Sequence, residues 1–121
     1  MKIRLLIKGF KNAIHGLVYV FKNEQNFRIQ IFVAFIVVMG MIIFPIGDYE
    51  RIALILLILL ILILELINSA IELFVDVTKP RLHHKVKLIK DIMAATVFVA
   101  STGAFIVGLL IFLPHIFKII W

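Results

Sequence analysis

Four polar residues that could do chemistry together, Glu65, Asn68, Glu72 and Asp76, follow directly on a long apolar run. Residues 52–64 consist of Ala, Ile and Leu alone, so a helix through this segment carries the polar group at membrane depth. With Glu65 taken as zero and about 100° per residue, the other three lie at about −60°, −20° and +20° in chain order. All four side chains therefore share one helix face. An ionisable group at that depth costs roughly 2.5–3.5 kcal/mol, so the pattern predicts a functional site.

The residue types in this part of the sequence match phosphoryl transfer. Mg²⁺ takes one or two carboxylates together with phosphate oxygens, and a lysine neutralises charge on the transferred group. Glu24 precedes one apolar run and Lys90-Asp91 opens another. A carboxylate in an apolar environment can accept the proton of an alcohol. Glu65 is placed deepest and suits that base, because a lipid alcohol arrives from the membrane, whereas Glu24 and Glu72 suit the metal.

These residues need apolar helices to position them. Of the 121 residues, 64% are hydrophobic. This composition and length predict a single integral membrane domain that comprises residues 1–121. The expected fold is all-α, with an amphipathic surface helix at 1–22 and membrane helices at 27–46, 50–77 and 87–114. The absence of cysteine excludes disulfides and thiolate metal sites.

The distribution of charge predicts the topology. Six basic residues precede the first apolar run and five lie between the last two, whereas Arg51 and Lys118 fall elsewhere. By the positive-inside rule, the N-terminus and the 78–90 loop are cytoplasmic, and the 47–51 turn and the C-terminus are outside. Five of the seven acidic residues then gather near the inner border. The net charge of +6 therefore indicates membrane borders rather than nucleic acid.

Plainer interpretations exist for several of these residues. Buried carboxylates can pair with lysines only to hold helices together, and Asp91 could simply complement the dipole of its helix. Adjacent His83 and His84 in a basic loop are more often solvated than metal-bound. The chain has no Walker A sequence and no glycine-rich nucleotide loop. Any nucleotide must therefore be held by the carboxylates, a metal, the lysine and surface residues.

The octapeptide Glu-Leu-Ile-Asn-Ser-Ala-Ile-Glu at 65–72, followed by Val75-Asp76 and Lys90-Asp91, resembles the signature of the prokaryotic diacylglycerol kinase family. Its members are small trimeric membrane lipid kinases. The resemblance covers nearly the whole chain, including Glu24-x-Asn26-x-Arg28. Residues 79–84 and 107–114 resemble the Gram-positive branch, which prefers undecaprenol.

The resemblance implies a role for each matching position. Glu65 matches the proton acceptor, and Glu24 and Glu72 match metal ligands that also lie against the nucleotide. Asn68 and Asp76 match supporting positions.

The same resemblance assigns the nucleotide site. Lys90 and Asp91 match positions that contact the ATP phosphates. Weaker positions of the nucleotide pocket fall at Asn12, Arg81, Leu82 and His83.

The sequence thus predicts an enzyme, an ATP-dependent and Mg²⁺-dependent kinase of the bacterial cytoplasmic membrane that converts undecaprenol to undecaprenyl phosphate. Diacylglycerol, giving phosphatidic acid, is the rival substrate, and ATP is not distinguished from other nucleoside triphosphates. A non-catalytic membrane pore or scaffold is the more remote alternative. The family resemblance implies a homotrimer with shared active sites, which the sequence alone does not establish.

Overall fold

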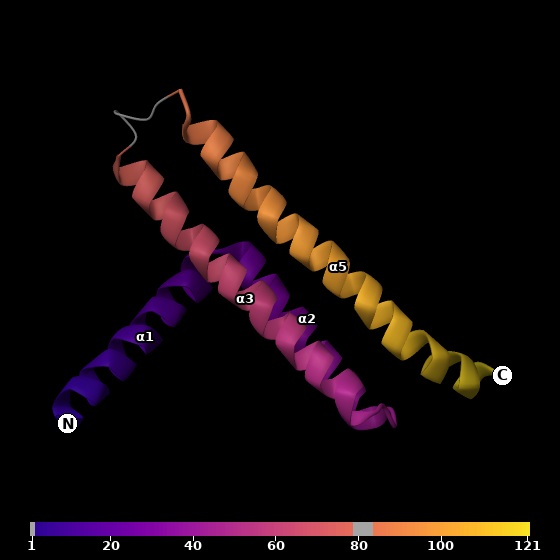
Figure 1. Ribbon diagram of the computed structural model, residues 1–121. Helices are drawn as coiled ribbons and strands as arrows, with labels where there is room; N and C mark the ends of the chain where they lie inside the picture. Colours follow the sequence, from indigo (N-terminus) through magenta and orange to yellow (C-terminus); the bar gives the residue numbers. More distant parts are fainter. Residues whose placement is uncertain (1, 79–83) are drawn as a thin grey trace.

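A computed structural model describes residues 2–78 and 84–121, which form four helices. They are α1 (Ile3–Asn23), α2 (Gln25–Ile43), α3 (Asp48–Val77) and α5 (Val86–Ile120). Helices α2, α3 and α5 run alongside one another, and α1 leaves this group at a steep angle (Figure 1). In the described part of the chain these three are long and apolar enough to cross a membrane. The predicted all-α fold, with three helices of membrane-spanning length and a separate amphipathic helix, is confirmed.

A one-residue break separates α1 from α2. Glu24 has an extended backbone, with φ of −117° and ψ of 110°. The guanidinium of Arg28 donates hydrogen bonds back to the carbonyls of Phe21, at 2.7 Å, and Lys22, at 3.0 Å. These carbonyls belong to the last turn of α1, where no helical N–H is available to them. Arg28 therefore fixes the angle at which α1 leaves the bundle.

The turn between α2 and α3 corrects two predicted boundaries. Helix α2 ends at Ile43, not at residue 46, and α3 already begins at Asp48 rather than at residue 50. Pro45 explains the first correction, because a residue before proline is disfavoured in the helical conformation and Phe44 is extended. At the start of α3, the Glu50 carboxylate accepts a hydrogen bond from the N–H of Gly47 at 3.0 Å.

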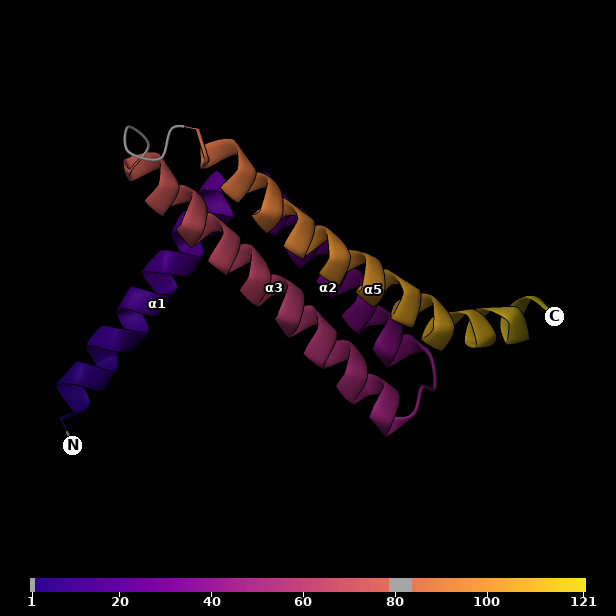
Figure 2. The same cartoon turned by 45° about the horizontal axis from the view of Figure 1, so that its top comes forward.

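Helix α5 continues through Pro114 to Ile120, beyond the predicted end at residue 114. A proline inside a helix removes one hydrogen bond and commonly bends the axis. The last turns of α5 do turn away from the rest of the helix (Figure 2). The helix nonetheless continues after Pro114, and the Trp121 N–H donates to the Phe117 carbonyl at 2.8 Å.

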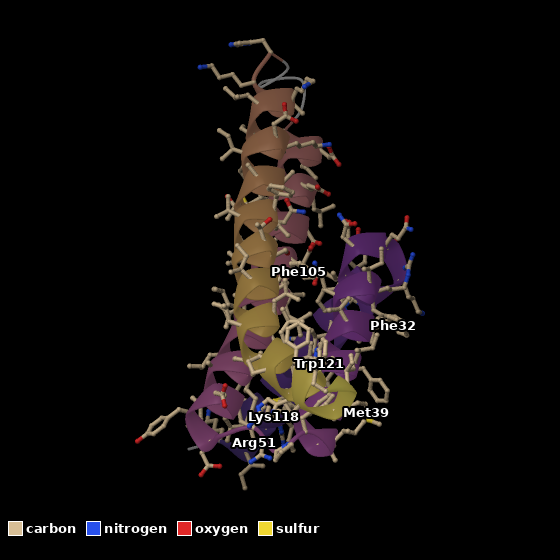
Figure 3. All side chains as sticks on the ribbon, turned by 90° about the vertical axis from the view of Figure 1, so that its right-hand side faces the viewer. Phe32, Met39, Arg51, Phe105, Lys118 and Trp121 are labelled. Atoms are coloured by element: carbon tan, nitrogen blue, oxygen red, sulfur yellow. The ribbon has the colours of Figure 1, made fainter. Side chains whose placement is uncertain are left out.

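The buried apolar core lies toward the end of the bundle that carries the α2–α3 turn. Met41, Ile46, Leu54 and Ile111 form it. Figure 3 shows Arg51 and Lys118 toward this same end of the bundle. Most large apolar side chains elsewhere in the described residues are exposed, as expected for helices that face lipid or a neighbouring subunit.

Candidate active site

Helix α3 buries the polar face that the sequence predicts. The side chain of Glu65 is only 2% exposed and that of Asn68 is 8% exposed, whereas Glu72 is half-buried and Asp76 is exposed. The gradient follows the helix from the interior of the bundle toward the α3–α5 connection. The deepest carboxylate is therefore the one predicted to act as the base.

The break between α1 and α2 brings a third carboxylate to this face. Glu24 interacts electrostatically with Glu72 and with Glu65, although about forty residues or more separate them in sequence. Partial burial, and then the negative charge of Glu72, raise the pKa of Glu24 above its usual value of 4.5. One chain thus assembles the three predicted carboxylates, and their mutual repulsion leaves a site that favours a cation.

Asn68 holds one of these carboxylates in place. Its Nδ2 donates a hydrogen bond to Oε1 of Glu72 at 3.3 Å. Its Oδ1 is buried and accepts no hydrogen bond from the described residues. Buried amide oxygens normally have a partner, so the unsatisfied Oδ1 marks a place where a bound group would be favourable.

The donor set fits Mg²⁺. Within residues 2–78 and 84–121, no three His, Asp or Glu side chains converge closely enough to hold a metal ion by themselves. Mg²⁺ does not require three, because one or two carboxylates with phosphate oxygens and water satisfy it. Glu24 and Glu72 would provide the carboxylates, and the amide of Asn68, which bonds to Glu72, would add a further oxygen.

A lysine reaches the same layer from α5. Nζ of Lys90 lies 2.8 Å from Oδ1 of Asp76, and its charge also acts on Glu72. The ion pair joins α5 to the end of α3. Its side chains remain 37% and 52% exposed, so the ammonium group is accessible to a phosphate ligand.

Other predicted site residues are not brought together in this way. Asp91 does not share the direction of Lys90, because neighbouring helix residues point about 100° apart. It pairs instead with Lys87 at 2.9 Å on an exposed surface of α5. Asn12 is exposed on α1. Arg81, Leu82 and His83 lie outside the described residues. His84 is exposed just before α5.

Two polar features were not singled out by the sequence analysis. Ser69 is 6% exposed, and its hydroxyl has no hydrogen-bond partner among the described residues. Its spacing of four from Glu65 is the signal that places it near the acidic face. Gln30 of α2 donates a hydrogen bond to the hydroxyl of Ser101 of α5 at 3.3 Å. Gln30 and Ser101 are each a polar residue within an apolar run. That pattern is the sequence signal that could have indicated a contact between them.

Buried and half-buried carboxylates, an asparagine and a lysine at one end of membrane-length helices define a membrane protein with a phosphotransferase-type site. Residues 11–112 match a protein-family model described as "Prokaryotic diacylglycerol kinase". The chain belongs to this family and is a membrane lipid kinase, as the sequence motifs predicted.

Individual relatives agree with this assignment. The chain is 33% identical to a diacylglycerol kinase of Synechocystis over 94% of its own length and 66% of the relative's. It is 32% identical to the undecaprenol kinase of Bacillus subtilis over 95% of its length and 94% of the relative's. It is 38% identical to a diacylglycerol kinase of Haemophilus influenzae over 78% and 80% of the two lengths.

Proposed function

We propose that this kinase transfers the γ-phosphoryl group of ATP to undecaprenol, giving undecaprenyl phosphate. The observation that carries the reaction is the burial of Glu65, which is 2% exposed and interacts electrostatically with Glu24 and Glu72. The choice of lipid is supported by residues 79–84 and 107–114, which resemble the undecaprenol-preferring branch. The match over 94% of the Bacillus undecaprenol kinase supports it further.

Each side chain has one task in the proposed reaction. Glu65 accepts the proton of the lipid hydroxyl as the lipid oxygen bonds to the γ-phosphorus and the bond to the ADP oxygen breaks. Lys90, held by Asp76, stabilises negative charge on the transferred group. Glu24 and Glu72 hold Mg²⁺, and the Asn68 amide orients Glu72. When bound, Mg²⁺ neutralises phosphate charge.

The remaining nucleotide contacts are proposed from the family resemblance. Asp91, Asn12 and the 81–83 segment would contact ATP beside the carboxylates. Closing the site around a nucleotide would require Asp91 to exchange its Lys87 partner, a change that an exposed pair permits at low cost.

The proposed assembly is a homotrimer in the bacterial cytoplasmic membrane, with the N-terminus and the 78–90 loop in the cytoplasm. Glu24 and Glu72 are only half-buried in one chain, so a neighbouring subunit could complete the nucleotide pocket. This openness supports shared sites in which the carboxylates come from one subunit and part of the enclosure from the next.

Substitution of Glu65 by glutamine tests the proposal. The change keeps the volume and removes the proton acceptor, so transfer of radiolabelled phosphate from ATP to undecaprenol in mixed micelles should fall by about 10²-fold or more. Glu50→Gln is the matched control, because its amide oxygen can still accept the Gly47 hydrogen bond far from the site. It should retain wild-type transfer.

The same assay separates the rival substrates and the non-catalytic alternative. Faster phosphorylation of diacylglycerol than of undecaprenol by the wild-type protein would replace the proposed substrate. Full transfer by Glu65→Gln would remove Glu65 from the role of base. A pore or scaffold would transfer phosphate to neither lipid.

A further inference from the structure

A groove between α1 and α3 lies beside the acidic face of α3. Its volume is about 700 Å³, and apolar side chains of both helices form most of its wall, among them Leu17, Val20, Leu66 and Leu73. Ser69 is the polar residue that α3 contributes to this wall. The groove is thus suited to the apolar chain of a lipid and offers a polar contact near Glu65.

Among the described residues, Ser69 carries the only buried hydroxyl that has no hydrogen-bond partner. Hydroxyls in helices commonly donate to a carbonyl one turn earlier. Thr78 donates in this way to the Phe74 carbonyl at 3.0 Å, and Thr96 to the Ile92 carbonyl at 2.9 Å. Ser69 has no such bond within the described part of the chain, although it is only 6% exposed. A buried hydroxyl without a partner is unfavourable, so a ligand group that bonds to it would relieve this cost.

The helical geometry places Ser69 between the groove and the predicted base. Relative to Glu65, Ser69 lies at about +40°, whereas Leu73 and Leu66 lie at about +80° and +100°. Asn68 and Glu72 lie on the other side of Glu65. A molecule lying along the groove therefore meets Ser69 before it meets the carboxylate, one helical turn away.

We propose that the α1–α3 groove holds the hydroxyl-bearing end of the lipid alcohol and that Ser69 is the positioning residue for that hydroxyl. The inference rests on the proposed lipid kinase reaction. The Ser69 hydroxyl donates to the lipid oxygen, while the lipid O–H donates to the carboxylate of Glu65. As the lipid oxygen bonds to phosphorus, its proton passes to Glu65 and ADP departs with the electrons of the broken P–O bond. Ser69 keeps its own proton throughout.

A second cavity, of about 360 Å³ between α2, α3 and α5, is a weaker candidate for this end of the lipid. Its polar side chains, Gln30 and Ser101, already bond to each other at 3.3 Å. A lipid hydroxyl there would have to break that bond, whereas Ser69 has no bond to break.

Substitution of Ser69 by alanine gives the first test. In mixed micelles, the KM for undecaprenol should rise by about fivefold or more, with the KM for ATP unchanged, because one hydrogen bond to the lipid is lost. A role confined to folding would lower the amount of active protein and leave both KM values as they were. Ser69→Thr retains the hydroxyl and should keep a KM for the lipid closer to that of the wild type.

A second variant fills the groove without touching the hydroxyl. A Cβ added at Gly16, which lines the groove, meets no atom within 4 Å, so the larger side chain of Gly16→Leu would occupy the groove. It should also raise the KM for undecaprenol by about fivefold or more. Gly103→Leu is the control, because Gly103 is equally open and lies outside the walls of both cavities.

The outcomes separate this inference from the proposed function. If the wild-type protein phosphorylates lipid and both Ser69→Ala and Gly16→Leu keep the wild-type KM for lipid, the groove assignment is wrong while the kinase reaction stands. If the wild-type protein phosphorylates neither undecaprenol nor diacylglycerol, the proposed function fails and the groove assignment fails with it.

Discussion

At the scale of single residues, Glu24 links the site to pH. Partial burial and the charge of Glu72 raise its pKa above 4.5, so the folded protein holds this proton more tightly than the unfolded chain. The resulting stabilisation is fully present below pH 4.5 and is lost as the pH rises through the raised pKa. In metal-free detergent buffer, the wild-type Tm should therefore fall from pH 4.5 toward neutrality, and Glu24→Gln should fall less.

The control for this measurement is Glu50→Gln, in the distant turn, which should follow the wild-type curve. Mg²⁺ with a non-hydrolysable ATP analogue should raise the wild-type Tm at neutral pH, because a bound cation replaces carboxylate repulsion with attraction. Identical pH dependence in wild type and Glu24→Gln would contradict the electrostatic contact between Glu24 and Glu72.

Asn68 should affect metal dependence more than lipid dependence. Asn68→Ala removes the donor that holds Glu72 and the unpartnered Oδ1 beside it. A hydrogen bond to a charged group contributes roughly 1.5–3 kcal/mol, so the Mg²⁺ concentration for half-maximal rate should rise by about tenfold or more. The KM for undecaprenol serves as the internal control and should stay within about twofold. A shift in the lipid KM alone would place Asn68 in the lipid site instead.

The shared face of Glu65, Asn68 and Glu72 could be predicted from the sequence, because helical periodicity alone fixes their relative angles. The sequence predicts only the depth of Glu24 in the membrane. It does not predict the contact of Glu24 with Glu72, because that contact depends on the angle between α1 and α2. The pairing of Asp91 with Lys87 at the start of α5 could not be predicted from the sequence for a similar reason. Whether an acid such as Asp91 faces a ligand or Lys87 depends on side-chain conformation, which spacing does not determine.

At the scale of elements, the Lys90–Asp76 pair is a charged contact that ties the start of α5 to the end of α3. Exposed ion pairs contribute roughly 0–1 kcal/mol, so Asp76→Asn should lower the Tm only slightly. It should nonetheless raise the KM for ATP by about threefold or more, because Lys90 loses the partner that directs it toward the phosphates. Asp48→Asn removes another exposed pair, with Arg51, and should leave the KM for ATP unchanged. Equal KM effects in both variants would contradict a positioning role.

The helices themselves were predictable, whereas their ends were less so. Apolar runs of membrane length predict the spans, because every backbone group in lipid must bond within its own helix. The ends depend on local competition. Pro45 ends α2 early through its effect on Phe44, whereas α5 continues past Pro114, because a proline removes one helical hydrogen bond and the bonds of later residues can still form. Proline thus has opposite consequences at the two positions.

At the scale of the whole molecule, the absence of cysteine makes the topology directly measurable. Tyr49 in the first turn of α3 and Lys85 just before α5 are both exposed, and the starts of these two helices lie at opposite ends of the bundle (Figure 1). Each can be replaced by a single cysteine. In intact cells a membrane-impermeant maleimide should label Tyr49→Cys, whereas Lys85→Cys should be labelled only after lysis. The reverse pattern would contradict the assignment of the basic connection to the cytoplasm.

The last prediction concerns which parts of the site one chain supplies. Glu24 and Glu72 interact within a single chain, so each subunit should carry its own pair of metal ligands even in a homotrimer. Inactive Glu24→Gln and Glu72→Gln proteins, unfolded together and reassembled in detergent, should therefore recover no activity in mixed oligomers. Wild-type protein mixed with either variant is the control for reassembly and should retain activity in proportion to its share. Recovery in the mixture of variants would mean that neighbouring subunits exchange these carboxylates across their interface.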